Sequence, residues 1–152
     1  MKKFFKKLIK VSIILVFFLN IDQVRSLVPY YYFPTTNNLQ EEGLSFGKNA
    51  YQLLSIGQYE QGLNLAKLAV KINNTDEKLW LILAEAQVAN NLYKQALNSL
   101  NNAENLNSNI SQIYFAKANV YLKISQIKNA KTALKTGLRI EPTNHIAIFQ
   151  LG

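Results

Sequence analysis

Few residues in this 152-residue sequence have the chemistry that a catalytic or metal site needs. His145 is the one histidine, and the absence of cysteine excludes a disulfide framework, a thiolate metal site and a cysteine nucleophile. Glu41 and Glu42 form a carboxylate pair, but their place before a helical pattern favours an electrostatic role at the helix N-terminus over acid–base catalysis. No serine or carboxylate lies in the context of a nucleophile elbow or a metal-ligand helix. We therefore predict no enzyme activity, no metal site and no cofactor.

The positive charge of the chain is concentrated at its N-terminus. The formal net charge is +8, and residues 1–26 carry +5 of it, from six basic residues and one aspartate. The remaining sequence has no basic stripe interleaved with aromatic residues, which is the pattern typical of nucleic-acid binding. We therefore expect no nucleic-acid partner.

Residues 1–26 have the layout of an export signal. Five lysines among the first ten residues precede the apolar run VSIILVFFL (11–19), and polar residues follow it. This run is too short to span a bilayer, which takes about 20 apolar residues. Val24 and Ser26 fit the small-residue pattern of a cleavage site, so a cleaved signal peptide would leave Leu27 as the first residue.

The same segment also fits an uncleaved membrane anchor. In that case its lysines would contact anionic lipid and the rest of the chain would stay tethered to the outer face of the inner membrane. Both alternatives place the rest of the chain across that membrane, in the periplasm, in a lumen or in the medium. A third interpretation, a buried helix of a cytosolic protein, is disfavoured because five lysines have no reason to lie beside a core.

Residues 27–42 are expected to form an extended aromatic arm. Pro29 and Pro34 disfavour helix at the residues that precede them, and the run between them is YYYF (30–33). These rings could rest at a membrane interface or cover an apolar edge of the following domain. We favour the cover, because an exposed aromatic patch of that size promotes aggregation.

The rest of the chain repeats at a fixed interval. The phrase QYEQGL (58–63) is followed by LYKQAL (92–97) and, after the same interval, by QIKNAK (126–131). Each repeat shows two amphipathic helical patterns separated by a short polar turn, so the unit is a helix–turn–helix and the fold is all-α. The gapless windows are 43–76, 77–110 and 111–144, and residues 145–152 begin a fourth.

Small residues recur at the places where the helices of each unit must approach. Two helices about 8–10 Å apart cannot both carry large side chains at their crossing point. The large residue that starts each second helix is expected to fill the wedge beside the turn; it is Tyr59, Tyr93 or Ile127. The small residues are Ala50, Ala84 and Ala118, then Gly62, Ala96 and Ala130, then Ala69, Ala103 and Gly137.

This pattern resembles the tetratricopeptide repeat (TPR) family. The resemblance rests on WxxLA at 80–84, on YxxA at 93–96 and on the repeat-ending proline of IEPTN at 140–144, and it covers residues 43–144. It implies a TPR-type helix–turn–helix solenoid with three 34-residue repeats plus the start of a fourth. Departures from the family pattern are Phe46 and Tyr114 for tryptophan, Gln87 for tyrosine, and Asn74 and Ser108 for proline.

The resemblance further implies a scaffold whose first helices line a concave groove for a peptide or helix of a client. Some family members clamp the carboxylate tail of chaperones with basic and amide side chains, and this sequence does not supply that clamp at the corresponding positions: Gly47, Tyr51, Glu85, Gln112 and Ala116. A hydrophobic client segment fits the groove better. The residues expected to hold it are Tyr51, Leu81, Ile82, Val88, Phe115 and Leu122, with Lys48, Lys78 and Asn119 bonding to backbone or acidic groups. The alternative is that these side chains only pack helix against helix.

Two functional hypotheses follow. The first is an exported or membrane-tethered adaptor that holds client proteins during assembly of a membrane complex. The second is a truncated repeat protein that self-associates and has no separate client. Residues 145–152 bear on the second, because about two helical turns cannot give the last repeat a polar outer face. Truncation is the favoured account of that end, and contact of its apolar residues with another chain is the alternative.

Overall fold

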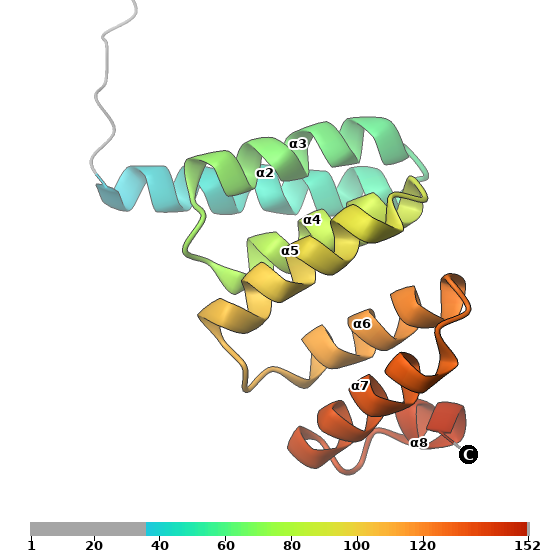
Figure 1. Cartoon of the computed structure of the whole chain (residues 1–152). Coiled ribbons are helices and arrows are strands. Elements are labelled where there is room, and N and C mark those ends of the chain that lie inside the picture. The colour runs from blue at the N-terminus through green and yellow to red at the C-terminus, as the bar shows by residue number, and fades with distance from the viewer. Residues whose placement is uncertain (1–35, 152) are drawn as a thin grey trace, which may run out of the picture. The chain divides into compact units, whose positions relative to one another are not determined.

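The structure is a computed structural model, and it describes residues 36–151. The predicted signal segment 1–26 and residues 27–35 of the predicted arm lie outside the described residues. All regular elements of residues 36–151 are helices, which confirms the predicted all-α class (Figure 1). They are α2 (Thr36–Ser55), α3 (Tyr59–Ile72), α4 (Glu77–Ala89), α5 (Tyr93–Leu106), α6 (Ser111–Lys123), α7 (Ile127–Ile140) and α8 (His145–Leu151).

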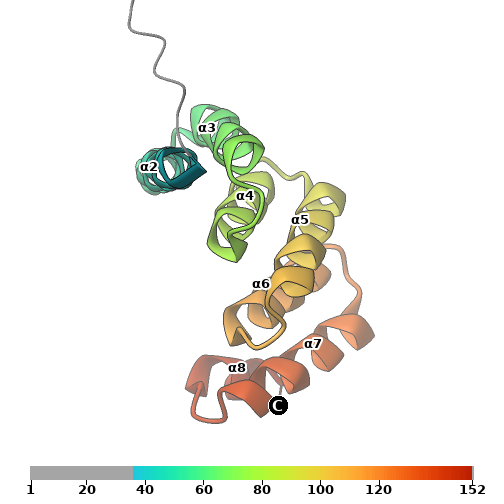
Figure 2. The same cartoon turned by 90° about the vertical axis from the view of Figure 1, so that its left-hand side faces the viewer.

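The helices pair in chain order and stack as a solenoid. Helices α2 and α3, α4 and α5, and α6 and α7 form three helix–turn–helix units, and α8 packs on α7 as the first helix of a fourth. Figure 2 shows the first helices α2, α4, α6 and α8 in one layer and the second helices α3, α5 and α7 in the other. None of the helices between residues 36 and 151 is long and apolar enough to cross a membrane.

Helix α2 begins at Thr36, so residues 36–42 are helical and the prediction of an extended arm through residue 42 is wrong for them. Their sequence, TNNLQEE, contains neither proline nor glycine and therefore nothing that breaks a helix. The next residue, Gly43, lets α2 approach the end of α3. A Cβ atom at Gly43 would lie 2.8 Å from the Cβ of Asn73.

The turn inside each unit has one backbone geometry, although its residues differ. Gly57, Asn91 and Ser125 occupy the same position in successive repeats and have φ angles of 80°, 60° and 60°. The N–H of the following residue donates to the carbonyl oxygen five residues earlier, at 2.8 Å in all three units. These are Schellman motifs, in which a left-handed residue closes the helix end with backbone hydrogen bonds.

Because the backbone closes these turns, the first residue of the second helix is not needed as a wedge. Helices α3, α5 and α7 do begin at Tyr59, Tyr93 and Ile127, as predicted. However, Tyr59 is 49% exposed and Ile127 is 51% exposed, and only Tyr93 is half-buried against the core. The expectation that all three fill the wedge is therefore wrong for two of them.

The small residues of the repeat pattern lie at helix crossings, as predicted. A Cβ atom at Gly62 would lie 2.8 Å from the Cδ2 of Leu54, so α3 approaches α2 closely at this point. All nine small residues of the pattern are buried: Ala50, Ala84, Ala118, Gly62, Ala96, Ala130, Ala69, Ala103 and Gly137.

The turns before α4 and before α6 are each held by a side chain of the helix that follows. The indole N–H of Trp80 donates to the carbonyl oxygen of Asn74 at 2.9 Å. Tyr114, the equivalent residue of the next repeat, donates its hydroxyl to the carbonyl oxygen of Ser108 at 3.0 Å. Two different aromatic residues thus make the same contact, and both bond to the position where the family pattern has proline.

The core consists of three successive clusters rather than one. Leu54, Leu79 and their neighbours fill the space among α2, α3 and α4. Leu100 and Val120 belong to a smaller cluster among α4, α5 and α6, and Leu134 belongs to a third among α6, α7 and α8. Each unit therefore packs only on its neighbours in the chain, as expected for a solenoid.

Candidate protein-binding pocket

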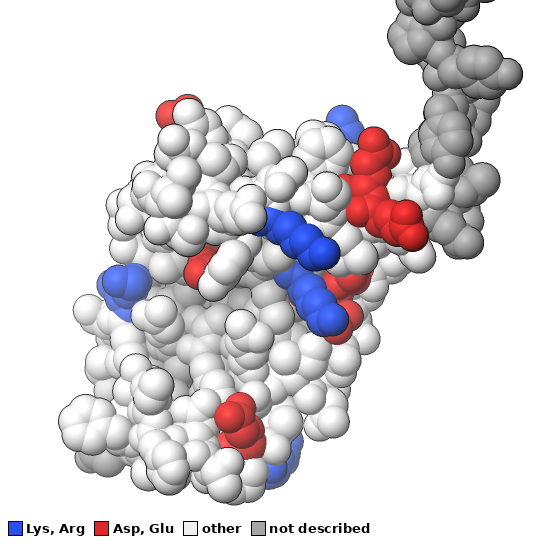
Figure 3. All heavy atoms as spheres, turned by 180° about the vertical axis from the view of Figure 1, so that it is seen from behind, with Lys and Arg blue, Asp and Glu red and all other residues white. Residues whose placement is uncertain are grey.

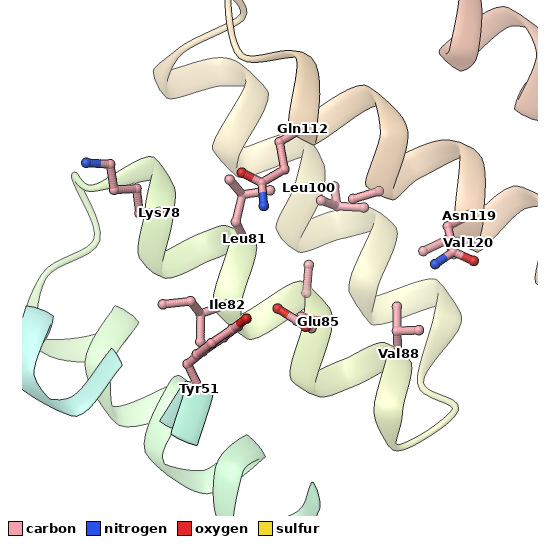
Figure 4. Close-up of a pocket in the computed structure, with 12 residues that line it drawn as sticks. Tyr51, Lys78, Leu81, Ile82, Glu85, Val88, Leu100, Gln112, Asn119 and Val120 are labelled. Atoms are coloured by element: carbon pink, nitrogen blue, oxygen red, sulfur yellow. The ribbon is translucent and has the colours of Figure 1, made fainter. Parts of the chain in front are cut away.

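A pocket of about 340 Å³ opens between α4 and α6 in the layer of first helices. Figure 3 shows this face of the molecule, which is mainly uncharged and hollowed between scattered charged side chains. Figure 4 shows the pocket residues on α4 and α6, with Tyr51 of α2 at one side. The residues that line the pocket are Tyr51, Lys78, Leu81, Ile82, Ala84, Glu85, Val88, Leu100, Gln112, Ala116, Asn119 and Val120.

One repeat position explains why the pocket lies between α4 and α6 and not between α2 and α4. In α2 this position is Gly47, and a methyl group added there would clash with the buried Leu79 of α4. In α4 the equivalent residue is Leu81, which lines the pocket, and α4 contacts α6 much less extensively than α2 contacts α4. The absent side chain at Gly47 allows close packing, whereas Leu81 stands between the two helices of the next pair.

The floor of the pocket is apolar and firmly packed. Leu100 and Val120 are fully buried, and they form a cluster with Ala84, to which Val88 and Ala116 also contribute. An apolar side chain that entered the pocket would therefore leave water and contact hydrocarbon on several sides. Burial of this kind contributes roughly 25 cal/mol for each Å² of apolar surface.

A row of polar groups crosses this apolar surface. Tyr51, Glu85 and Asn119 occupy one repeat position on the three first helices, and all three line the pocket. They present a phenol, a carboxylate and a carboxamide. Partial burial raises the pKa of the Glu85 carboxyl above its usual value, because the charged form loses water.

The structure brings six of the nine predicted site residues together. These six line the pocket: Tyr51, Leu81, Ile82, Val88, Lys78 and Asn119. The other three, Lys48, Phe115 and Leu122, do not line it. The ring of Phe115 packs against Gly137 of α7 and belongs to the third core cluster, while Lys48 and Leu122 lie at the surface of their helices.

The repeat pattern does not identify the floor of the pocket as a binding feature. It assigns Ala84 only to a helix crossing, and it assigns neither Leu100 nor Val120 to the groove. The available signal was Ala116, which stands where Lys48 and Ile82 stand in the earlier repeats. A small residue at that position leaves room above Val120, one turn further along α6, which lines the floor of the pocket.

Comparisons with known proteins agree with this geometry at the level of the fold. No protein-family model matches the sequence, and no curated protein is significantly similar to it. Solved structures are similar. The TPR domain of Arabidopsis OM64 has a TM-score of 0.71 and 17% identity over 74% of this chain and 93% of that one.

Two further structures share the fold and contain a bound peptide. The second TPR domain of human RPAP3, in complex with an HSP70 peptide, has a TM-score of 0.69 and 18% identity over 74% of this chain and 94% of that one. The secretion chaperone SycD of Yersinia enterocolitica, in complex with a peptide of the translocator YopD, has a TM-score of 0.66 and 15% identity over 70% and 87%. The described chain is therefore a TPR-type helical solenoid.

Proposed function

We propose that the protein is a non-catalytic scaffold or adaptor that holds a hydrophobic peptide or helix of a client protein in the groove formed by α2, α4 and α6. The observation that carries this proposal is the pocket between α4 and α6. It combines an apolar floor with polar groups that can bond to a peptide backbone, which is the usual composition of a site for a peptide or small ligand.

The peptide complexes of similar folds support the proposal. Human RPAP3 binds an HSP70 peptide, and SycD binds a peptide of YopD, each through a domain with the same helical architecture. A groove built by the first helices of stacked repeats is a common site for an extended segment or a helix.

We further propose that the adaptor acts outside the cytosol, either exported or tethered to a membrane, in the assembly of a membrane complex. The support is the sequence of residues 1–26, with basic residues before a short apolar run and a polar end. Intact-mass analysis of the protein isolated from its own host separates the two forms. A mass that begins at Leu27 identifies an exported protein, and retention of Met1 in the membrane fraction identifies a tethered one.

The groove hypothesis is tested by a charge placed in the pocket. Leu81→Glu puts a second carboxylate on the apolar wall, one turn from Glu85, and should reduce client capture in pull-downs from the host by tenfold or more. It removes the apolar surface on which the client packs and adds a charge that loses water when the client binds. Leu106→Glu is the matched control, because Leu106 is an exposed leucine on α5, outside the pocket.

Circular dichroism must show an unchanged fold for both leucine variants. Equal capture by the wild type and by Leu81→Glu would overturn the groove as the binding site. Equal loss of capture by both variants would indicate a general effect of surface charge and would also contradict the proposal.

A second candidate function, self-association without a separate client, is favoured by the apolar surface of α8. Ile146 is 74% exposed, Ile148 is 47% exposed and Phe149 is 87% exposed. Sedimentation equilibrium measures this directly. A dimer that Phe149→Asp converts to a monomer would support the second candidate, and a monomeric wild-type chain would exclude it.

A further inference from the structure

The pocket between α4 and α6 contains a carboxylate that the described chain leaves without an ion-pair partner. Glu85 lies on α4 between Leu81, one turn before it, and Val88, one turn after it. No ion pair joins Glu85 to another residue in the part of the chain that the structure describes. The ammonium group that lines the same pocket belongs to Lys78, which is seven residues earlier, or about 10 Å along the helix axis.

The groups that face Glu85 from α6 are uncharged. Gln112, Ala116 and Asn119 line that wall, and Figure 4 shows the two amides on α6 with Glu85 on the facing helix. The amides can bond to a peptide backbone, but neither carries a charge that compensates the carboxylate. Glu85 is therefore the one negative group among the residues that line the pocket.

A client side chain that fills this pocket must compensate the carboxylate or bury it. A purely apolar side chain would remove water from Glu85 and return no hydrogen bond, which is costly for an ionised group. An acidic side chain would add repulsion between like charges. A lysine or arginine side chain satisfies both parts of the pocket, because its aliphatic stem can pack on Leu81 and Val88 while its charged end reaches Glu85.

We propose that the pocket between α4 and α6 selects a lysine or arginine side chain within an otherwise apolar client segment, and that Glu85 is the residue that recognises it. This inference rests on the proposed function, because it specifies which client segment the groove accepts. The groove should therefore prefer a basic client segment, whereas a groove with a basic clamp prefers an acidic peptide tail.

The experiment uses the full chain and three short fluorescein-labelled peptides of the same apolar sequence. The central residue is lysine, its uncharged analogue norleucine, or glutamate, and binding is measured by fluorescence anisotropy. We expect the lysine peptide to bind about fivefold more tightly than the norleucine peptide and the glutamate peptide to bind most weakly, as for a partly exposed ion pair.

Three variants test whether Glu85 is responsible for the preference for the lysine peptide. Glu85→Gln keeps the shape of the side chain and should reduce the lysine preference to less than twofold. Glu85→Lys should reverse it in favour of the glutamate peptide. Glu60→Gln is the matched control and should retain the fivefold preference, because Glu60 is an exposed residue of α3 that does not line the pocket.

The outcomes separate this inference from the proposed function. If the lysine and norleucine peptides bind equally and Leu81→Glu abolishes both, the groove binds apolar segments and the role of Glu85 is refuted. If Glu85→Gln retains the lysine preference, another residue is responsible and the inference fails. If no peptide binds, the inference is overturned as well, whereas the proposed function is still decided by the effect of Leu81→Glu on client capture.

Discussion

The two interfaces between neighbouring first helices differ, although they are built from equivalent residues. In the first interface, α2 packs closely on α4, and Leu79 and Ile82 of α4 occupy the space beside Gly47. In the second interface, α4 and α6 are joined less extensively, and the space beside Leu81 is the pocket. The core clusters agree with this difference in packing. The cluster at the first interface contains more buried residues than the cluster at the second.

This difference indicates how a solenoid forms a pocket without changing its repeat. Schellman turns and small crossing residues occur in every unit, so they do not determine where the groove opens. The position occupied by Gly47, Leu81 and Phe115 does vary. Glycine at this position closes the first interface, leucine keeps the second open, and Phe115 packs against Gly137 within its own unit.

The largest effect is expected when the closed interface is forced open. Gly47→Leu introduces into α2 the side chain that α4 already carries, and it collides with Leu79, which is almost fully buried. Overpacking of this kind should lower the free energy of unfolding by about 3 kcal/mol. Urea denaturation followed by circular dichroism measures the loss.

The reciprocal substitution tests the open interface. Leu81→Ala at the equivalent position removes a half-buried side chain from the pocket wall, so it should cost only about 1 kcal/mol. Similar losses for the two variants would contradict the view that one interface is filled and the other open.

The regular period of the sequence predicted the architecture because it is a property of every repeat. Helix starts at Tyr59, Tyr93 and Ile127 follow from the periodic pattern, and so does the burial of the small residues. A pattern shared by all repeats does not show the contacts that a residue makes in one repeat only. Gln87, a departure from the family pattern, is buried and accepts a hydrogen bond from the hydroxyl of Ser99 at 2.7 Å.

The pocket was predictable only in part, for the same reason. The repeat pattern assigns Leu81 and Phe115 to the same groove position and therefore predicts both in the site. In the structure Gly137 of α7 leaves room for the ring of Phe115. A periodic pattern within one helix cannot predict this contact, because it joins residues of two different helices.

Outside the pocket, α6 is also joined to the second helix α5 by a polar contact. Lys117 of α6 forms an ion pair with Glu104 of α5, and their side chains are 11% and 32% exposed. The hydrogen bond from Lys117 is the main cause that holds the pKa of the Glu104 carboxyl below its usual value. A carboxyl with a lowered pKa stabilises the fold above its unfolded pKa, and this contribution is lost as the pH falls through the folded pKa.

We therefore expect Glu104→Gln to lower the free energy of unfolding by about 1 kcal/mol at neutral pH, because Lys117 would be left partly buried without its anion. The difference from the wild type should disappear in acid, where the wild-type carboxyl is protonated. Glu60→Gln, on the exposed surface of α3, should have no measurable effect. A loss that is independent of pH would show that Glu104 acts by packing rather than by charge.

The smallest effect is expected at Glu85, in the pocket between α4 and α6, and it has the opposite sign. Partial burial raises the pKa of this carboxyl, so its charged form weakens the fold above that pKa, and the penalty disappears as the pH falls through it.

The titratable groups that line the pocket with Glu85 are Tyr51 and Lys78. Glu85→Gln should therefore raise the free energy of unfolding at neutral pH. The gain should be only a few tenths of a kcal/mol, because the Glu85 side chain still has enough exposed surface for water to screen its charge. Urea titrations at neutral and acidic pH should show this gain only at neutral pH. A loss of stability in Glu85→Gln would mean that the carboxylate already has a compensating partner, and the pocket would then have no need of a basic client side chain.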